Sequence, residues 1–261
     1  MGNEIYLCRN DLSLDTYERG EKFPHFILLA KDAEGHRQLR ELSSRAWSHS
    51  FTMFLTRVPT YYKDIEEVIG SNPGHIVASS ACIGGWLGIC FLNQKRDEAI
   101  NFITWAKAIF HDDFYLEIQP ARYEEQMEYN KWLLEIGRRT NTKCIITTDA
   151  HYLRKGDREI HSAFLNSKDG ERETSDFYQY TYIMTPDEIR ELTADYLNED
   201  IIQTLFNNTN EINDKITRYD LFQPQIVPHL SDDRLKHPEW IETFKMIKNI
   251  STAKEQQNDE R

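Results

Sequence analysis

An aspartate and a histidine, Asp149 and His151, close the run KCIITTDAH at residues 143–151. The run begins with apolar, strand-like residues, and in an extended chain side chains two positions apart point to the same side. A carboxylate and an imidazole that share one side could bind zinc or manganese together. A D-x-H pair is also common by chance, so the pair by itself does not establish a metal site.

Three more residues with metal-binding side chains lie on or after other strand-like runs. They are Glu4, His25 and Cys82. In a parallel α/β barrel the C-terminal ends of the strands converge on one mouth, so these residues could meet Asp149 and His151 there. The mixed oxygen, nitrogen and sulfur set suits zinc or manganese, with magnesium as a further option. Taken singly, each residue could equally be a solvated carboxylate, the first residue of a strand or a small buried thiol.

Strand-like and helical runs alternate through the first 150 residues. The sequence predicts strands and helices in turn, which favours a parallel α/β domain. The predicted strands are residues 3–8, 25–30, 75–82, 114–119 and 143–151, and the predicted helices are 33–47, 95–110 and 123–140.

The last third of the chain reads as helical and then extended. TPDE predicts a helix start, with Thr185 as N-cap, Pro186 in the first turn and Glu188 closing a capping box. This helix should run to about residue 195, and a second helix should occupy about 199–214. The proline-marked YDLFQPQIVPHL and a polar tail follow.

The composition limits the classes of function. The formal net charge is −12, so the chain has no broad electrostatic reason to hold DNA or RNA directly. The cysteines form no CxxC pair, which argues against a zinc ribbon, and no apolar stretch is long enough to span a bilayer. We therefore expect a soluble, cytoplasmic protein with no membrane partner.

Several segments resemble the PHP (polymerase and histidinol phosphatase) domain of bacterial DNA polymerase III alpha subunits. GNEIY resembles G-x-E-[IV]-Y, HIVASSACIGG resembles G-L-I-A-L-S-G-C-L-G-G, and FHDDFYLEIQ resembles F-G-D-D-F-Y-L-E-L-Q. HFILLAKDAEGHRQL, TTDAHYLRKGDREIHSAFL and NNTNEINDKI also resemble blocks of that family. The blocks keep the family's order across about residues 2–230, and several are long enough to be specific.

The resemblance implies a distorted β/α barrel with a metal centre at its strand ends. Glu4, His25, Cys82, Asp149 and His151 fall on the family's metal-ligand positions. The centre is associated with phosphoesterase or proofreading 3′–5′ exonuclease activity in some members and with a structural role in others. Bound metals polarise phosphoryl oxygens and generate a hydroxide nucleophile.

Metal-bound histidines usually need partners that orient them, and Glu117 and Thr148 are candidates for that role. No residue is assigned as catalytic. The resemblance predicts a partial PHP-like metal-binding domain at residues 1–230, with a C-terminal helical part, and a polar extension or linker at 231–261.

The family pattern also includes parts that we expect to be absent. Its H-x-H strand and an aspartate–histidine pair would precede GNEIY, and no H-x-H occurs in this sequence. We therefore expect an incomplete barrel in which EIYLC forms an open edge, and metal occupancy lowered by the missing ligands. The family's polymerase palm would follow the proline-marked segment, so we expect no polymerase activity from this chain alone.

Three functions remain open. The chain could be the PHP portion of a DNA polymerase III alpha-like replicative polymerase, partnered by the remaining polymerase segments or subunits and reaching DNA only through them. It could be a stand-alone PHP phosphoesterase, although such enzymes more usually have histidine at the position of Cys82. It could also be a non-catalytic assembly module.

Overall fold

We describe a computed structural model of the chain, covering residues 1–8, 23–50, 58–167 and 176–222. The chain divides into two compact units, Met1–Tyr219 and Asp220–Arg261. The predicted extension at 231–261, and the proline-marked segment from residue 223 onward, lie outside the described residues. The sheet and the helices described by residue range all lie in the first unit.

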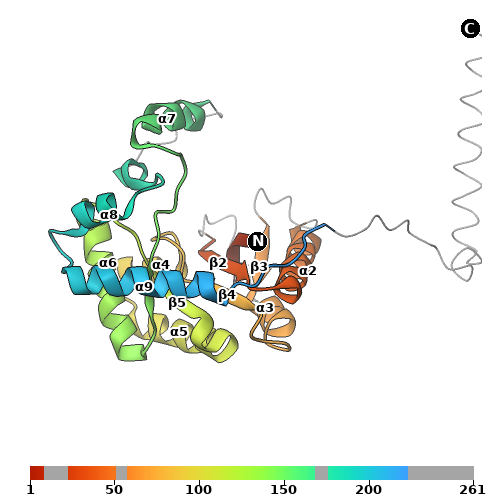
Figure 1. Ribbon diagram of the computed structural model, residues 1–261. Coiled ribbons are helices and arrows are strands. Elements are labelled where there is room, and N and C mark those ends of the chain that lie inside the picture. The colour runs from red at the N-terminus through yellow and green to blue at the C-terminus, as the bar shows by residue number, and fades with distance from the viewer. Residues whose placement is uncertain (9–22, 51–57, 168–175, 223–261) are drawn as a thin grey trace, which may run out of the picture. The chain divides into compact units, whose positions relative to one another are not determined.

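Six strands form one mixed sheet in the order β3-β1-β2-β4-β5-β6 (Figure 1). The strands are β1 (Gly2–Cys8), β2 (His25–Ala30), β3 (Pro59–Tyr61), β4 (Ile76–Ser79), β5 (Phe114–Ile118) and β6 (Cys144–Ile146). β2 is antiparallel to both β1 and β4, whereas the β1–β3, β4–β5 and β5–β6 pairs are parallel. The α/β class is confirmed, the purely parallel arrangement is wrong, and the described strands do not show closure into a barrel.

The expectation that EIYLC forms an open edge is wrong for its last three residues. β3, which the sequence analysis did not predict, pairs with residues Tyr6–Cys8 of β1, so this part of β1 lies inside the sheet. The outer strand β3 is three residues long and begins at Pro59. A short strand that starts with proline suits an edge, because it offers few unpaired backbone groups to another chain.

The predicted helices are confirmed to within a few residues, and the described part of the chain holds three further α-helices. α3, α4 and α7 were not predicted. The helices of eight or more residues are α2 (Ala33–Ser50), α5 (Arg96–Phe110), α6 (Glu124–Thr140), α7 (Arg158–Asn166), α8 (Pro186–Thr193) and α9 (Glu199–Lys215), and the shorter ones are α3 (Tyr62–Val68) and α4 (Trp86–Leu92). No helix among the described residues is both long and apolar enough to cross a membrane.

The predicted start of α8 is present in detail. Thr185 Oγ1 accepts a hydrogen bond from the Glu188 amide at 3.3 Å, and Glu188 Oε2 accepts one from the Thr185 amide at 2.8 Å. Each residue therefore satisfies a backbone donor that the first turn of a helix leaves without a partner.

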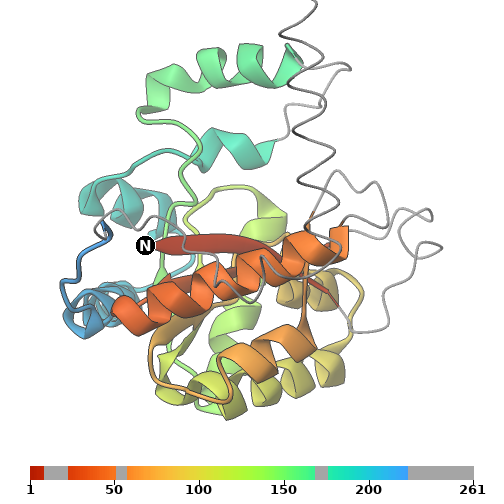
Figure 2. The ribbon, with the colours of Figure 1, turned by 90° about the vertical axis from the view of Figure 1, so that its right-hand side faces the viewer.

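The first face of the sheet carries the main core. Phe26, Leu28 and Ala30 alternate along β2 and are almost completely buried. Alternate residues of a strand share a face, so this side meets the apolar residues of α2, α3, α5 and α6 in one cluster. Figure 2 looks onto α2, which packs against β2 and β3.

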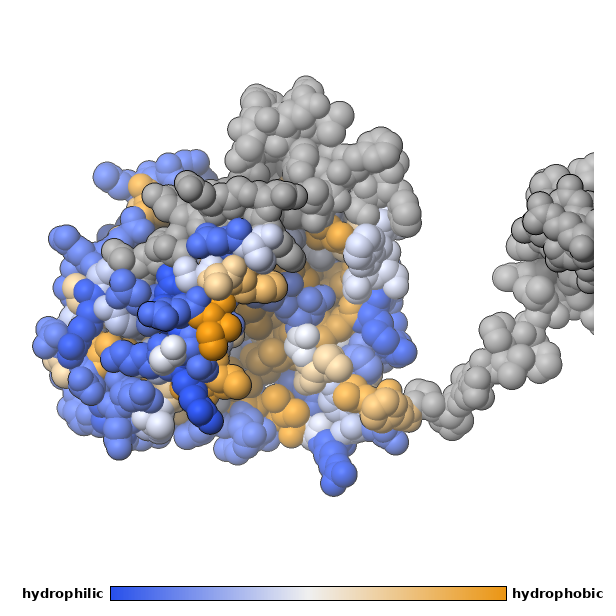
Figure 3. Space-filling view, turned by 90° about the horizontal axis from the view of Figure 1, so that it is seen from above, coloured by the Kyte–Doolittle hydropathy of each residue, from blue (hydrophilic) through white to orange (hydrophobic). Residues whose placement is uncertain are grey.

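The second face is apolar at one end only. Val77, Tyr115 and Ile145 lie on it and pack against Ile212 of α9, with Leu29 beside them. Further along the same face the alternate positions are polar, with Ser79 on β4 and Glu117 on β5. Figure 3 shows a mainly hydrophilic surface, seen from above, with apolar residues gathered around a hollow.

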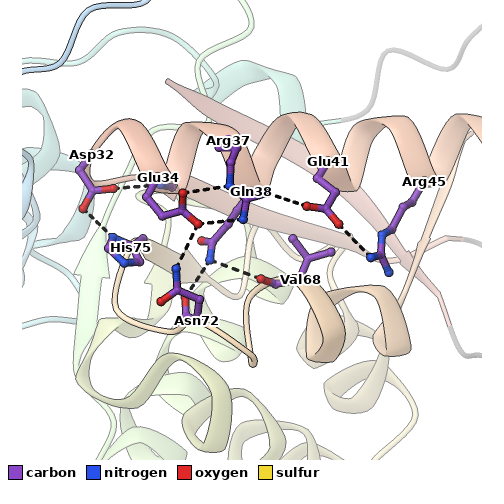
Figure 4. Close-up of polar contacts among 10 residues, drawn as sticks. Asp32, Glu34, Arg37, Gln38, Glu41, Arg45, Val68, Asn72 and His75 are labelled. Carbon is purple, nitrogen blue, oxygen red and sulfur yellow. Dashed lines mark hydrogen bonds and ion pairs between the residues drawn. The ribbon is translucent and has the colours of Figure 1, made fainter. Parts of the chain in front are cut away.

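Hydrogen bonds from polar side chains hold α2 against α3 and the turn after it (Figure 4). Gln38 is fully buried, and its Nε2 donates to the backbone oxygens of Val68 at 3.3 Å and Asn72 at 2.7 Å. On the exposed side, Arg37 donates to both carboxylate oxygens of Glu34. The buried contacts fix α2 against α3 and the turn that follows it, whereas the exposed ion pairs add little stability.

An ion-pair network holds α9 against the sheet. Lys215 Nζ lies 2.7 Å from the Tyr115 hydroxyl, 2.9 Å from Asp113 Oδ1 and 3.0 Å from Glu211 Oε1. Glu211 also accepts a hydrogen bond from Lys143. The network joins the C-terminal half of α9 to β5 and to the start of β6.

Glu211 should make stability sensitive to acid. The hydrogen bond from Lys143, and then that from Lys215, lower the pKa of Glu211 from 4.5 to about 2. A lowered carboxyl pKa contributes stability above pH 4.5 that is lost as the pH falls towards 2. In urea unfolding at several pH values, Glu211→Gln should lose less stability than the wild type across this window. Glu191→Gln, which removes an exposed carboxylate of α8, should follow the wild type, and equal acid sensitivity of both variants would contradict this assignment.

Candidate metal centre

The five predicted ligand residues line one cleft at the polar end of the second face. The cleft has a volume of about 230 Å³. Its lining consists of Glu4, Tyr6, His25, Cys82, Asp149, His151, Phe177 and Tyr178. Residues as far apart in the sequence as Glu4 and His151 therefore line the same cleft. Three aromatic residues that the sequence analysis did not single out line it as well.

Glu4 and His25 are brought together by strand register. β1 and β2 are antiparallel, with Tyr6 opposite His25 and Glu4 two positions from Tyr6. Glu4 Oε1 lies 2.7 Å from His25 Nδ1, and this contact is the main cause of a lowered pKa at Glu4. His25 stands at the beginning of its strand rather than at its end, and it reaches the cleft because β2 runs antiparallel to its neighbours.

Cys82 reaches His25 through the loop that follows β4. Its Sγ lies 3.6 Å from His25 Nδ1 and accepts a hydrogen bond from the Gly84 amide at 3.3 Å. Glycine is required at position 85, because a Cβ atom there would lie 2.3 Å from the backbone oxygen of Ser80. Burial raises the pKa of the Cys82 thiol to about 12, so the sulfur carries its proton unless a cation displaces it.

Asp149 and His151 share the cleft, but not by strand alternation. The predicted strand to residue 151 is too long, because β6 ends at Ile146. Asp149 has φ of 44°, in the left-handed region that aspartate tolerates better than most residues. His151 Nδ1 lies 2.6 Å from the Asp149 backbone oxygen, and the two side chains approach to 3.9 Å. A turn therefore sets the relation of the two side chains, and burial raises the pKa of Asp149.

Glu117 is buried outside the lining of the cleft and accepts several hydrogen bonds. Its carboxylate accepts hydrogen bonds from Ser79 Oγ at 2.5 Å, Thr147 Oγ1 at 2.6 Å and Gln119 Nε2 at 3.1 Å. Burial is the main cause of its raised pKa, and the charge of Asp149 adds to the shift. Glu117 is therefore coupled electrostatically to Asp149, and its hydrogen bonds fix the strand ends of β4, β5 and β6 relative to one another.

Thr148, the other residue expected to orient a ligand, lies elsewhere. It lines a separate small pocket with Gln119 and Tyr180. Its neighbour Thr147 makes the hydrogen bond to Glu117 instead. The roles of Glu117 and Thr148 beside a metal ion stay predictions.

The donor atoms suit a divalent metal by their chemistry and shared location. Carboxylate, imidazole and thiolate are the ligands that zinc and manganese accept. Among the described residues, however, no three His, Cys, Asp or Glu side chains are positioned to hold a metal ion together. His25 Nδ1 contacts Glu4, so binding would require these two side chains to turn and Cys82 to lose its proton.

Tyr6, Phe177 and Tyr178 are the cleft residues that sequence reasoning missed. Tyr6 had a signal, because it is two positions from Glu4 in a strand and therefore shares its face. Phe177 and Tyr178 had none, because they follow His151 at a distance along the chain and no local pattern connects them to it.

Comparison with known proteins relates the chain to DNA polymerases. Residues 1–121 match the PHP domain family. Over 99% of its length the chain is 41% identical to the "Probable DNA polymerase YorL" of Bacillus subtilis (strain 168), and equally to a "DNA-directed DNA polymerase" of Bacillus phage SPbeta. Over 95% of its length it is 29% identical to a DNA polymerase III subunit alpha of Helicobacter pylori.

The chain spans about a fifth of the length of these relatives, 21% of the Bacillus and phage proteins and 20% of the Helicobacter protein. Glu4, His25 and Cys82 fall within the segment that matches the PHP domain, whereas Asp149 and His151 lie beyond it. The cleft thus joins residues on both sides of residue 121.

Removing Glu117 should destabilise the fold. Glu117→Ala would leave the buried donors of Ser79, Thr147 and Gln119 without their acceptor, at a cost of about 3 kcal/mol or more in the free energy of unfolding. Glu117→Gln keeps one carbonyl acceptor and should cost about 1 kcal/mol. Chemical denaturation measures both, and Glu128→Ala, at an exposed position of α6, should change stability by less than about 0.5 kcal/mol. An unchanged free energy of unfolding in Glu117→Ala would show that the hydrogen bonds to Glu117 do not stabilise the fold.

Proposed function

Because residues 1–121 belong to the PHP domain family, within a chain related along its whole length to bacterial and phage DNA polymerases, we propose that this region contributes a divalent metal centre to a DNA polymerase III alpha-like replicative polymerase. The proposed ligands are the five polar cleft residues, Glu4, His25, Cys82, Asp149 and His151. The observation that carries the proposal is their convergence on one cleft of about 230 Å³ from four separate segments of the chain.

The proposed ligands differ in charge and in the donor atom that they offer to a metal ion. Glu4 and Asp149 offer oxygen, His25 and His151 offer nitrogen, and Cys82 offers sulfur. Zinc and manganese suit this mixture, and magnesium would use the carboxylates. When bound, such an ion polarises a phosphoryl oxygen and lowers the pKa of a coordinated water.

We propose a 3′–5′ exonuclease or related phosphoesterase activity at this centre. The supporting feature is the openness of the cleft, whose donors His25 and Glu4 both retain substantial side-chain exposure, 33% and 46%. A phosphoester could therefore reach them without the sheet opening. The net charge of −12 favours delivery of DNA by the remaining segments of the polymerase rather than by this chain.

A structural role is the second candidate, and a specific observation favours it. No ready three-residue ligand group exists among the described side chains, so any ion could be held weakly and serve assembly alone. In that case the partners would be the same polymerase segments, and hydrolysis would be absent.

Metal binding is the first test. The full chain, stripped with a chelator, should bind Mn²⁺ or Zn²⁺ in isothermal titration calorimetry. His25→Gln and Asp149→Ala should each weaken binding about tenfold or more, because each removes a proposed ligand.

His75→Gln is the matched control for His25→Gln. His75 Nδ1 lies 2.7 Å from Asp32 Oδ2, the same separation as in the Glu4–His25 pair, but neither residue lines the cleft. Its titration should match the wild type. Equal losses in both histidine variants would remove the support for a site in the cleft.

Hydrolysis separates the two candidate roles. If the centre is a phosphoesterase, the metal-loaded chain should release nucleotides from the 3′ end of single-stranded DNA, and His151→Gln should lower the rate at least about tenfold. Electrophoresis of a 5′-labelled strand measures the products. Metal binding that raises thermal stability without any metal-dependent cleavage would favour the structural role.

A further inference from the structure

One wall of the cleft is aromatic. Phe177 and Tyr178 line it beside His151, and Tyr6 lines it beside His25. We propose that Phe177 is a stacking platform for the nucleobase of the terminal nucleotide. This inference rests on the proposed function and names the residue that would position the base beside the metal centre.

The aromatic wall is tied to the segment that carries His151. The His151 amide donates to the Thr181 backbone oxygen at 2.7 Å, and residues Tyr152 and Tyr182 form a parallel bridge. The Tyr152 hydroxyl donates to the Tyr178 backbone oxygen at 2.6 Å. Phe177 therefore keeps a defined position relative to the donor His151, which a platform next to a reacting phosphate requires.

The two aromatic rings beside His151, those of Phe177 and Tyr178, differ in their surroundings. Tyr178 lies between His151, His161 and Arg158, with the Arg158 guanidinium carbon 5.8 Å from its ring centroid and the His161 ring at 5.1 Å. These neighbours fix Tyr178 in place. It therefore acts as the support of the wall.

Phe177 is less enclosed. Its ring meets His151 at 6.1 Å and 84°, and Tyr178 at 5.2 Å and 76°. Both contacts are nearly perpendicular, and among the described residues no aromatic ring lies parallel to Phe177. The side chain is half-buried and borders the open cleft, so a parallel-stacked partner can come from a ligand.

The ligand chemistry follows from the two kinds of lining. A metal ion held by the proposed ligands would bind an anionic phosphoryl group. The aromatic wall beside these ligands can stack on a planar ring of the same molecule. A nucleotide carries both groups. Because Glu4 and Asp149 would repel a bare phosphate, binding should also depend on the metal.

Binding of two single strands tests the inference. Fluorescence anisotropy of the full chain with Mn²⁺ compares a short 5′-labelled thymidine oligonucleotide with an abasic oligonucleotide of the same length and label. Stacking of one base corresponds to about a 5- to 150-fold preference for the strand with bases. Phe177→Ala should remove most of this preference, and Phe177→Trp should keep it.

Phe164→Ala is the matched control. Phe164 is 58% exposed on α7 and does not line the cleft, so the substitution should leave the preference unchanged. A preference that survives in Phe177→Ala, or is lost equally in Phe164→Ala, would overturn the assignment of Phe177.

The same samples distinguish failure of the inference from failure of the proposed function. A wild-type chain that binds Mn²⁺ but holds both strands equally would overturn the nucleobase platform and leave the metal centre standing. A wild-type chain that binds no Mn²⁺ would overturn both.

Discussion

Alternate residues of the central strands point to the same face of the sheet. On the second face these residues are apolar at one end of the strands and polar at the other. Val77 is followed by Ser79 on β4, and Tyr115 by Glu117 on β5. The apolar end packs against α9, whereas at the polar end Ser79 and Glu117 are buried and joined by a hydrogen bond. The site therefore depends on one sheet face being apolar at one end and polar at the other, where Glu4 and His25 reach the cleft.

The carboxylates in and near the cleft differ in the direction of their pKa shifts. Glu4 has a lowered pKa because His25 contacts it, while Asp149 in the cleft and the buried Glu117 outside its lining have raised pKa values because burial disfavours their charged forms. Asp149, whose charged form is costly in the cleft, would gain most from a bound cation. This electrostatic argument agrees with the donor chemistry, although the Glu4–His25 contact has to be exchanged before an ion can bind.

The similarity to polymerases covers almost the whole of this chain but only about a fifth of the length of the relatives. The proposed exonuclease role of the cleft has to be reconciled with the net charge of −12, which gives the chain no broad electrostatic attraction for nucleic acid. Under the proposed function, a bound metal ion would supply positive charge at the cleft itself.

The sequence by itself determined the local elements and the identity of the five polar cleft residues. Apolar periodicity predicted β1, β2, α5 and α6, the TPDE motif predicted the start of α8, and family resemblance named Glu4, His25, Cys82, Asp149 and His151. Only the tertiary structure decided that β2 is antiparallel, that β3 covers β1, and that Phe177 lies beside His151. These features depend on backbone pairing between segments distant in the chain, as in the bridge between Tyr152 and Tyr182, and such pairing leaves no local pattern in the residues.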